Sequence, residues 1–70
     1  MNTRQSEMYQ KLYNQFSPWL TTLRNDNKKK DLMRSNRHVW GYLTALVDYD
    51  VISMEIYQTL EMDLRLGEGA

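Results

Sequence analysis

Residues 9–23 read YQKLYNQFSPWLTTL, and the spacing of their large apolar side chains decides the fold class. These side chains recur at the three- and four-residue steps of one helical face. They are Tyr9, Leu12, Tyr13, Phe16, Trp19, Leu20 and Leu23. Pro18 lacks an N–H group, and its ring clashes with the carbonyl four residues earlier. Because the apolar spacing stays in phase across Pro18, we expect one helix over about residues 3–24, kinked there. Two helices, the second capped by Ser17, are the alternative.

Two further helices are predicted, each after a break in the apolar pattern. Residues 25–27, Asn-Asp-Asn, form the first turn signal. Apolar residues at helical spacing then predict a second helix over about residues 28–48 and a third over about residues 53–66. The connections are short. The sequence therefore predicts a single all-α domain, either a three-helix bundle or a helical hairpin arrangement.

Glycines and capping residues mark features of these helices. Gly41 lies inside the second helix at a cost of about 1 kcal/mol relative to alanine, and we expect a neighbouring helix to approach closely there. Gly67 suits the left-handed conformation that follows helix C-termini, and we expect residues 68–70 beyond it to be frayed. Candidate N-caps are Asn2 or Thr3 for the first helix, Asp26, Asn27 or Asp31 for the second, and Ser53 for the third.

The composition limits what can stabilise so small a chain, which has 70 residues, no cysteine and one histidine. A core of this size rarely supplies more than about 3–5 kcal/mol. Without cysteine there is no disulfide, and one histidine cannot complete a closed zinc site. We therefore expect no metal or other cofactor. Assembly into a homo-oligomer, or a bound partner, is the expected source of additional stability.

Nothing in the sequence indicates a membrane or a secretion signal. No stretch approaches the roughly 20 apolar residues that cross a bilayer. The first seven residues are polar, unlike a signal peptide. The lack of cysteine fits a reducing compartment. We expect a cytoplasmic protein that makes no membrane contact.

The formal net charge of zero conceals an uneven distribution. Residues 1–44 hold eight basic and three acidic side chains, a net charge of +5, whereas residues 45–70 hold one basic and six acidic, a net charge of −5. Either the acidic third helix neutralises the basic start of the second within the fold, or one or both ends attract charged partners. The sequence leaves both interpretations open.

The densest positive charge lies between Arg24 and His38. On a helix, four side chains of this stretch project to roughly the same side. They are Lys30, Arg34, Arg37 and His38. Such a ridge can follow phosphate groups, so a nucleic-acid-binding accessory protein is the alternative function. Its contact residues would be Lys28, Lys29, Lys30, Arg34 and Arg37.

No catalytic constellation is evident, so we predict that the chain is not an enzyme and takes no small-molecule substrate. His38 is the only histidine, and nothing resembles a nucleophile elbow or a glycine-rich phosphate loop. The acidic pair Asp48 and Asp50 lacks the remaining ligands of a calcium loop. An enzyme whose sites are shared between chains is the one catalytic class that stays open.

The chain is instead rich in side chains that are typical of protein interfaces. The residues beyond obvious core needs are Trp19, Trp40, Tyr42, Tyr49, Met8, Met33, Met54 and Met62. We therefore predict a small helical interaction module, which is an adaptor, regulator or inhibitor of the phage or mobile-element accessory type. Its predicted partner contacts are Lys30, Arg34, Arg37, Trp40 and Tyr42.

Overall fold

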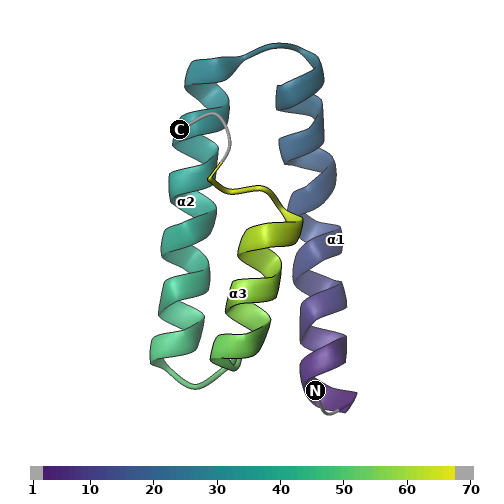
Figure 1. The fold of residues 1–70 in the computed structure, drawn as a ribbon, viewed down its shortest axis with the longest axis vertical. Coiled ribbons are helices and arrows are strands. Elements are labelled where there is room, and N and C mark those ends of the chain that lie inside the picture. Colours follow the sequence, from purple (N-terminus) through teal and green to yellow (C-terminus); the bar gives the residue numbers. More distant parts are fainter. Residues whose placement is uncertain (1–2, 68–70) are drawn as a thin grey trace.

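The computed structural model describes residues 3–67 and arranges them as three α-helices. α1 spans Thr3–Asn25, α2 spans Lys29–Asp48 and α3 spans Met54–Asp63. α1 and α2 are antiparallel, and the shorter α3 runs back along one half of this pair (Figure 1). The molecule is elongated, with extents of 36 × 19 × 14 Å. The predicted all-α class is confirmed, and the architecture is the three-helix bundle.

Pro18 lies inside α1, which continues without a break from Thr3 to Asn25. The expectation of one helix rather than two is therefore confirmed, whereas the kink stays a prediction. Asn14 carries the carbonyl that loses its usual partner at this proline. Both residues are exposed, so water can satisfy that carbonyl group.

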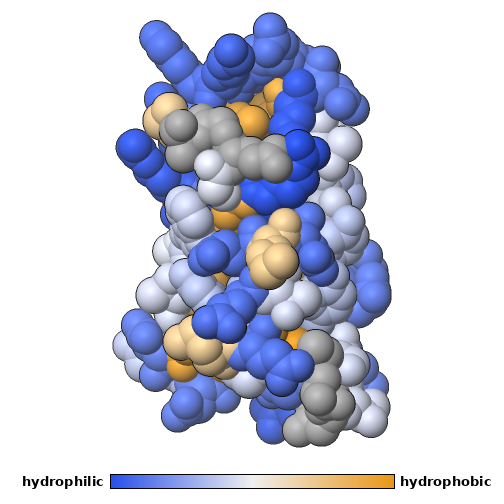
Figure 2. Space-filling view, viewed as in Figure 1, coloured by the Kyte–Doolittle hydropathy of each residue, from blue (hydrophilic) through white to orange (hydrophobic). Residues whose placement is uncertain are grey.

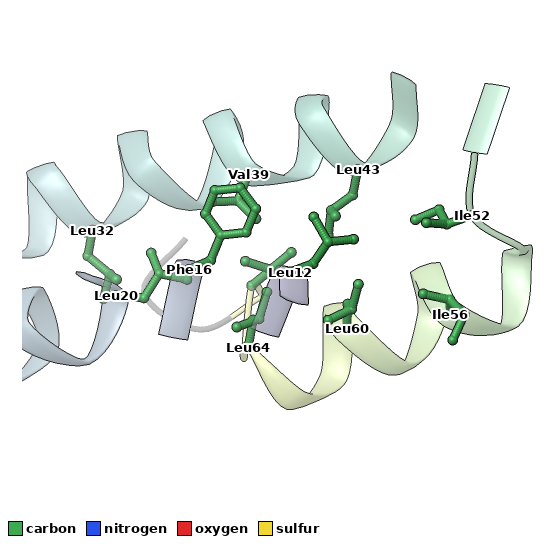
Figure 3. Close-up of a cluster of buried hydrophobic side chains, with 11 residues drawn as sticks. Leu12, Phe16, Leu20, Leu32, Val39, Leu43, Ile52, Ile56, Leu60 and Leu64 are labelled. Atoms are coloured by element: carbon green, nitrogen blue, oxygen red, sulfur yellow. The ribbon is translucent and has the colours of Figure 1, made fainter. Parts of the chain in front are cut away.

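Apolar side chains from all three helices and from the segments that follow α2 and α3 form one core (Figure 3). Its buried members are Leu12, Phe16, Leu20, Leu32, Val39, Leu43, Ile52, Ile56, Leu60, Leu64 and Leu66. α1 contributes every fourth residue from Leu12 to Leu20, which confirms the centre of the stripe expected from residues 9–23. Trp19 is the exception, because it is 42% exposed and does not pack against the core. Tyr9 and Tyr13 pack at the edge of this core.

Each helix ends in the same hydrogen-bonded turn, the Schellman motif, in which two successive N–H groups return to carbonyls of the last turn. The donor and acceptor pairs are Asn27 to Arg24 and Lys28 to Leu23 after α1, Asp50 to Val47 and Val51 to Leu46 after α2, and Arg65 to Met62 and Leu66 to Glu61 after α3. The motif needs one left-handed residue, and here these residues are Asn27, Asp50 and Arg65, with φ of 56°, 59° and 57°. None of the three is glycine.

The expected end of the third helix is therefore wrong, because α3 stops at Asp63 and Arg65 takes the left-handed position expected for Gly67. Stopping early turns the chain across the α1–α2 pair, where Leu64 and Leu66 become buried. Burial of these two leucines outweighs the cost of a left-handed arginine, which is about 1–2 kcal/mol. The fraying expected for residues 68–70 lies outside the described residues.

Of the remaining capping predictions, one is confirmed and one is wrong. Ser53 is the N-cap of α3, where its Oγ accepts the N–H of Ile56 at 3.2 Å, so that prediction is confirmed. The caps expected for the second helix are wrong, because Lys28 occupies the N-cap position and no side chain caps it. Thr3 is the first residue of α1, and Asn2 lies outside the described residues.

Gly41 also differs from expectation. It is exposed, and a Cβ placed on it would meet nothing within 4 Å. The close approach of a neighbouring helix at this position is therefore wrong. Gly41 lowers the stability of α2 without an intramolecular packing reason.

Polar contacts attach α3 and the residues around it to α1. The Tyr9 hydroxyl donates to an Asp63 carboxylate oxygen, and the Gln5 Oε1 accepts the Ser53 N–H at 2.9 Å. The hydrogen bond to Asp63, together with partial burial, raises the pKa of Tyr9 to about 12. These contacts fix the register of α3 along α1.

Candidate partner-binding surface

The candidate surface begins where α1 turns into α2, at the end of the molecule that α3 does not reach (Figure 1). Lys28 precedes α2, and Lys29 and Lys30 lie in its first turn. All three are exposed. Cations at this position oppose the helix dipole, which costs roughly 0.3–1 kcal/mol each at an exposed site. The fold therefore keeps three lysines where they do not stabilise the helix.

The predicted ridge lies on the solvent side of α2, opposite the buried residues Leu32, Val39 and Leu43. Lys30 and Arg34, and further along Arg37 and His38, are all exposed. We call Lys28, Lys29, Lys30, Arg34 and Arg37 the basic end. All five of its side chains are exposed.

The two predicted aromatic contacts flank this ridge on opposite sides. Trp40 is half-buried between α2 and α3, where its indole Nε1–H donates to Glu61 at 3.0 Å. Tyr42 faces α1 with 42% of its surface exposed, and its ring lies edge-on to Phe16 at 5.5 Å. The structure therefore places the five predicted partner contacts on three neighbouring surfaces and does not bring them together on one.

Charge separates along the length of the molecule. Residues 24–37 carry six basic and two acidic side chains, a net charge of +4, and residues 48–63 carry five acidic side chains and no basic one. α3 packs beside the second half of α2, as the contacts of Trp40 with Glu61 and of Thr44 with Tyr57 show. The acidic helix therefore does not cover the basic start of α2. The sequence left open whether the acidic third helix neutralises the basic start of the second helix within the fold. In the structure, α3 does not lie beside the start of α2, so this neutralisation does not occur there.

Arg24 has a structural role that the sequence did not reveal. Its Nη2 donates to the carbonyl oxygens of Leu64 at 2.7 Å and Arg65 at 3.0 Å. These carbonyls follow the C-terminus of α3, where the helix dipole favours a positive charge. Arg24 therefore joins the last turn of α1 to the segment that closes the core.

A hollow of about 470 Å³ opens between the end of α1 and the start of α2. Figure 2 shows apolar atoms inside a hydrophilic surround in the upper part of the molecule. Apolar residues and basic or polar residues share the lining, which comprises Leu23, Leu32, Met33, Arg24, Asn27, Lys28 and Lys29. Periodicity alone could not reveal it, because the hollow exists only where α3 is too short to reach.

The outer face of α3 carries exposed apolar side chains among carboxylates. Met54 is 55% exposed and Met62 is 75% exposed. Glu55 is exposed beside Met54, and Asp48 and Met54 line the same small depression. Exposed methionines are typical of adaptable binding surfaces. α3 is therefore a second candidate contact surface, acidic where the basic end is positive.

Trp19 and Tyr49 are also exposed, at 42% and 82%. Trp19 lies edge-on to the ring of His38 at 6.3 Å, with Arg34 beside them. Met8 and Trp40 pack against the core instead. Met33 is half-buried and lines the hollow. The aromatic and methionine side chains are thus divided between core and surface.

Within residues 3–67, no group of three or more metal-ligating side chains comes together. In the same part of the chain, no helix has the length and apolar character needed to cross a membrane. Comparison with protein-family models, with curated proteins and with solved structures gives no significant match.

Proposed function

We propose that this protein is a non-catalytic helical interaction module that binds an acidic protein surface through its basic end. It acts as an adaptor, regulator or inhibitor by occupying that surface. The observation that carries the proposal is the separation of charge along the molecule, with the basic end exposed and α3 beside the opposite half of α2. Such an arrangement attracts and orients an acidic partner.

We assign direct contacts to Lys30, Arg34 and Arg37, which lie on the solvent side of one helix over about 10 Å. Tyr42 adds an exposed aromatic side chain beside this ridge. Trp40 supports the surface indirectly, since its hydrogen bond to Glu61 holds α3 against α2. We also propose a cytoplasmic location and a phage or mobile-element accessory role, which the lack of cysteine and the small size support.

A charge-reversal experiment tests the proposal. Wild-type protein and the variant Lys30→Glu/Arg34→Glu are used as baits in extracts of the native host, and captured proteins are identified by mass spectrometry. The matched control is Arg4→Glu/Lys11→Glu, which changes the net charge equally at exposed positions of α1. We expect the captured protein to be lost only with the first variant. Equal capture by all three baits would contradict binding through the basic end.

Nucleic-acid binding is the second candidate, favoured by the exposure of five basic side chains within ten residues. α3 could not enter a major groove as a recognition helix, because its described charged residues are all acidic and phosphates would repel it. Contact would instead use the basic end. This candidate requires binding that weakens steeply with salt and is lost when Lys28, Lys29, Lys30 and Arg34 are replaced by serine. No retention of duplex or single-stranded probes at low salt would exclude it.

A further inference from the structure

The two halves of one long face complement each other in shape. α3 has 10 residues, whereas α1 has 23 and α2 has 20. At 1.5 Å per residue, α3 covers only about 15 Å of a pair of helices that is about 30 Å long. α3 therefore covers one half of the face shown in Figure 1. Beyond α3, residues 64–67 cross the pair, and the 470 Å³ hollow lies between the end of α1 and the start of α2.

The same two halves also complement each other in chemistry. The hollow has an apolar floor of Leu23, Leu32 and Met33, and Lys28 and Lys29 stand at its edge. The start of α3 presents the reverse arrangement. There the exposed apolar side chain of Met54 lies next to Asp48 and Glu55. Such a group suits the hollow, because its apolar side chain can contact the apolar floor while its carboxylates face the lysines at the edge.

We propose that a second copy of this chain occupies the hollow, in an antiparallel face-to-face dimer. The two-fold axis lies in the plane of the interface and crosses the long face at its middle. It therefore brings each half of the face opposite the other half of the same face in the second copy. It places the start of each α3 over the hollow of the other copy, so that Met54 enters the hollow and Asp48 and Glu55 face Lys28 and Lys29. This contact is made twice, and the dimer is closed. The inference rests on the proposed function, because it uses the same basic end and names its partner.

The face is large enough for such a dimer. Its extents of 36 × 19 Å allow on the order of 600 Å² per copy, or about 1,200 Å² in total, at the lower limit of stable protein interfaces. A contact of this size that depends on exposed charges is expected to be weak and to dissociate as salt screens them. Dimer formation should therefore depend on both protein concentration and ionic strength.

Sedimentation equilibrium of the full chain at low and high salt tests the dimer. We expect a monomer–dimer equilibrium for the wild type that shifts toward monomer as salt is raised. Met54→Lys should weaken dimerisation at least about tenfold, because the exposed side chain contributes to the interface and not to the core. Gln15→Lys, which adds the same single positive charge on an exposed part of α1, is the matched control and should leave the equilibrium unchanged.

A charge exchange between two chains provides the sharper test. Lys28→Glu/Lys29→Glu and Asp48→Lys/Glu55→Lys should each be monomeric alone, because like charges then face each other across both contacts. Mixed together, they should form a heterodimer, since both contacts are again between opposite charges. Far-UV circular dichroism verifies that each variant is folded.

Three results would overturn the inference: a wild type that is monomeric at the highest attainable concentration, charge variants that still dimerise alone, or a mixture of folded variants that stays monomeric. In any of these cases, capture of a different protein that depends on Lys30 and Arg34 would leave the proposed function standing. If the dimer forms as expected but capture of host proteins is equal with the wild type and with Lys30→Glu/Arg34→Glu, the proposed function is refuted instead.

Discussion

Replacing Gly41 by alanine should stabilise this protein by about 1 kcal/mol. Gly41 lies in the interior of α2, twelve residues after its first residue, Lys29, and seven before its last, Asp48. Glycine at such a position costs about 0.8–1.0 kcal/mol relative to alanine, because its backbone loses more freedom on folding. The added Cβ would meet no atom within 4 Å, so no steric term offsets this gain.

The expected effect is large for a chain of this size. A change of 1 kcal/mol shifts the melting temperature of a 60–100-residue domain by roughly 4–8 °C. Urea denaturation followed by circular dichroism at 222 nm should show a higher midpoint with an unchanged slope, because the surface exposed on unfolding does not change. A single helical residue thus produces a shift well above measurement error.

Ala45 provides the matched control, since it is exposed one turn further along the same helix. Ala45→Gly should destabilise the protein by about 1 kcal/mol, and the double variant Gly41→Ala/Ala45→Gly should return close to the wild type. A Gly41→Ala variant that is no more stable than the wild type, while Ala45→Gly behaves as expected, would refute the reasoning. It would mean that another part of the molecule approaches Gly41 in solution.

Three further changes test contacts elsewhere in the bundle. Arg24→Met should destabilise the protein by about 1–3 kcal/mol in urea denaturation, because it removes the donor to the carbonyls after α3 while keeping an apolar stem; Lys11→Met should have little effect. Asp50→Gly should raise the unfolding free energy by roughly 0.5–1 kcal/mol, since glycine takes a φ of 59° without strain; Asp50→Ala should not. Tyr9 holds its proton more tightly in the folded protein, where its pKa is about 12, than in the unfolded chain, where it is 10.0, so stability should fall as pH rises from 10 toward 12. Tyr9→Phe should remove that part of the pH dependence, and an unchanged profile would contradict the link to Asp63.

Much of the fold follows from local patterns in the sequence. The helical spacing of Leu12, Phe16 and Leu20 identifies the buried face of α1, and Ser53 identifies the start of α3. Both features depend on neighbours only a few residues away along the chain. Such local determinants can be recognised without knowledge of the tertiary structure.

The end of α3 could not be predicted in this way, because it depends on competition between distant parts of the chain. A local pattern favours Gly67 as the left-handed residue, but burial of Leu64 and Leu66 against α1 and α2 moves that position to Arg65. The role of Arg24 is hidden for the same reason, since its acceptors lie about 40 residues later. The prediction for Gly41 was wrong for a different reason. A close helix–helix contact was expected there, but this part of α2 is exposed.

The candidate surface was also only partly predictable from the sequence. Counting charges predicts the exposed ridge of Lys30, Arg34 and Arg37, because charged side chains rarely lie in a core. The hollow could not be predicted, since it results from the difference in length between α3 and the other helices. Nor could the sequence place Trp40 between two helices, where its indole is bonded to Glu61.

The shortness of α3 also has a consequence for hydrogen exchange. Isolated helices below about 12–15 residues are marginal in water, so the 10-residue α3 persists only through its contacts with α1 and α2. Its amide protons should exchange through a local opening that needs less free energy than global unfolding, whereas those at the centres of α1 and α2 exchange last. Each opening uncovers Ile56 and Leu60 together with the leucines beneath them. Within residues 3–67, we therefore expect opening of α3 to expose sites for proteolysis before the rest of the bundle unfolds.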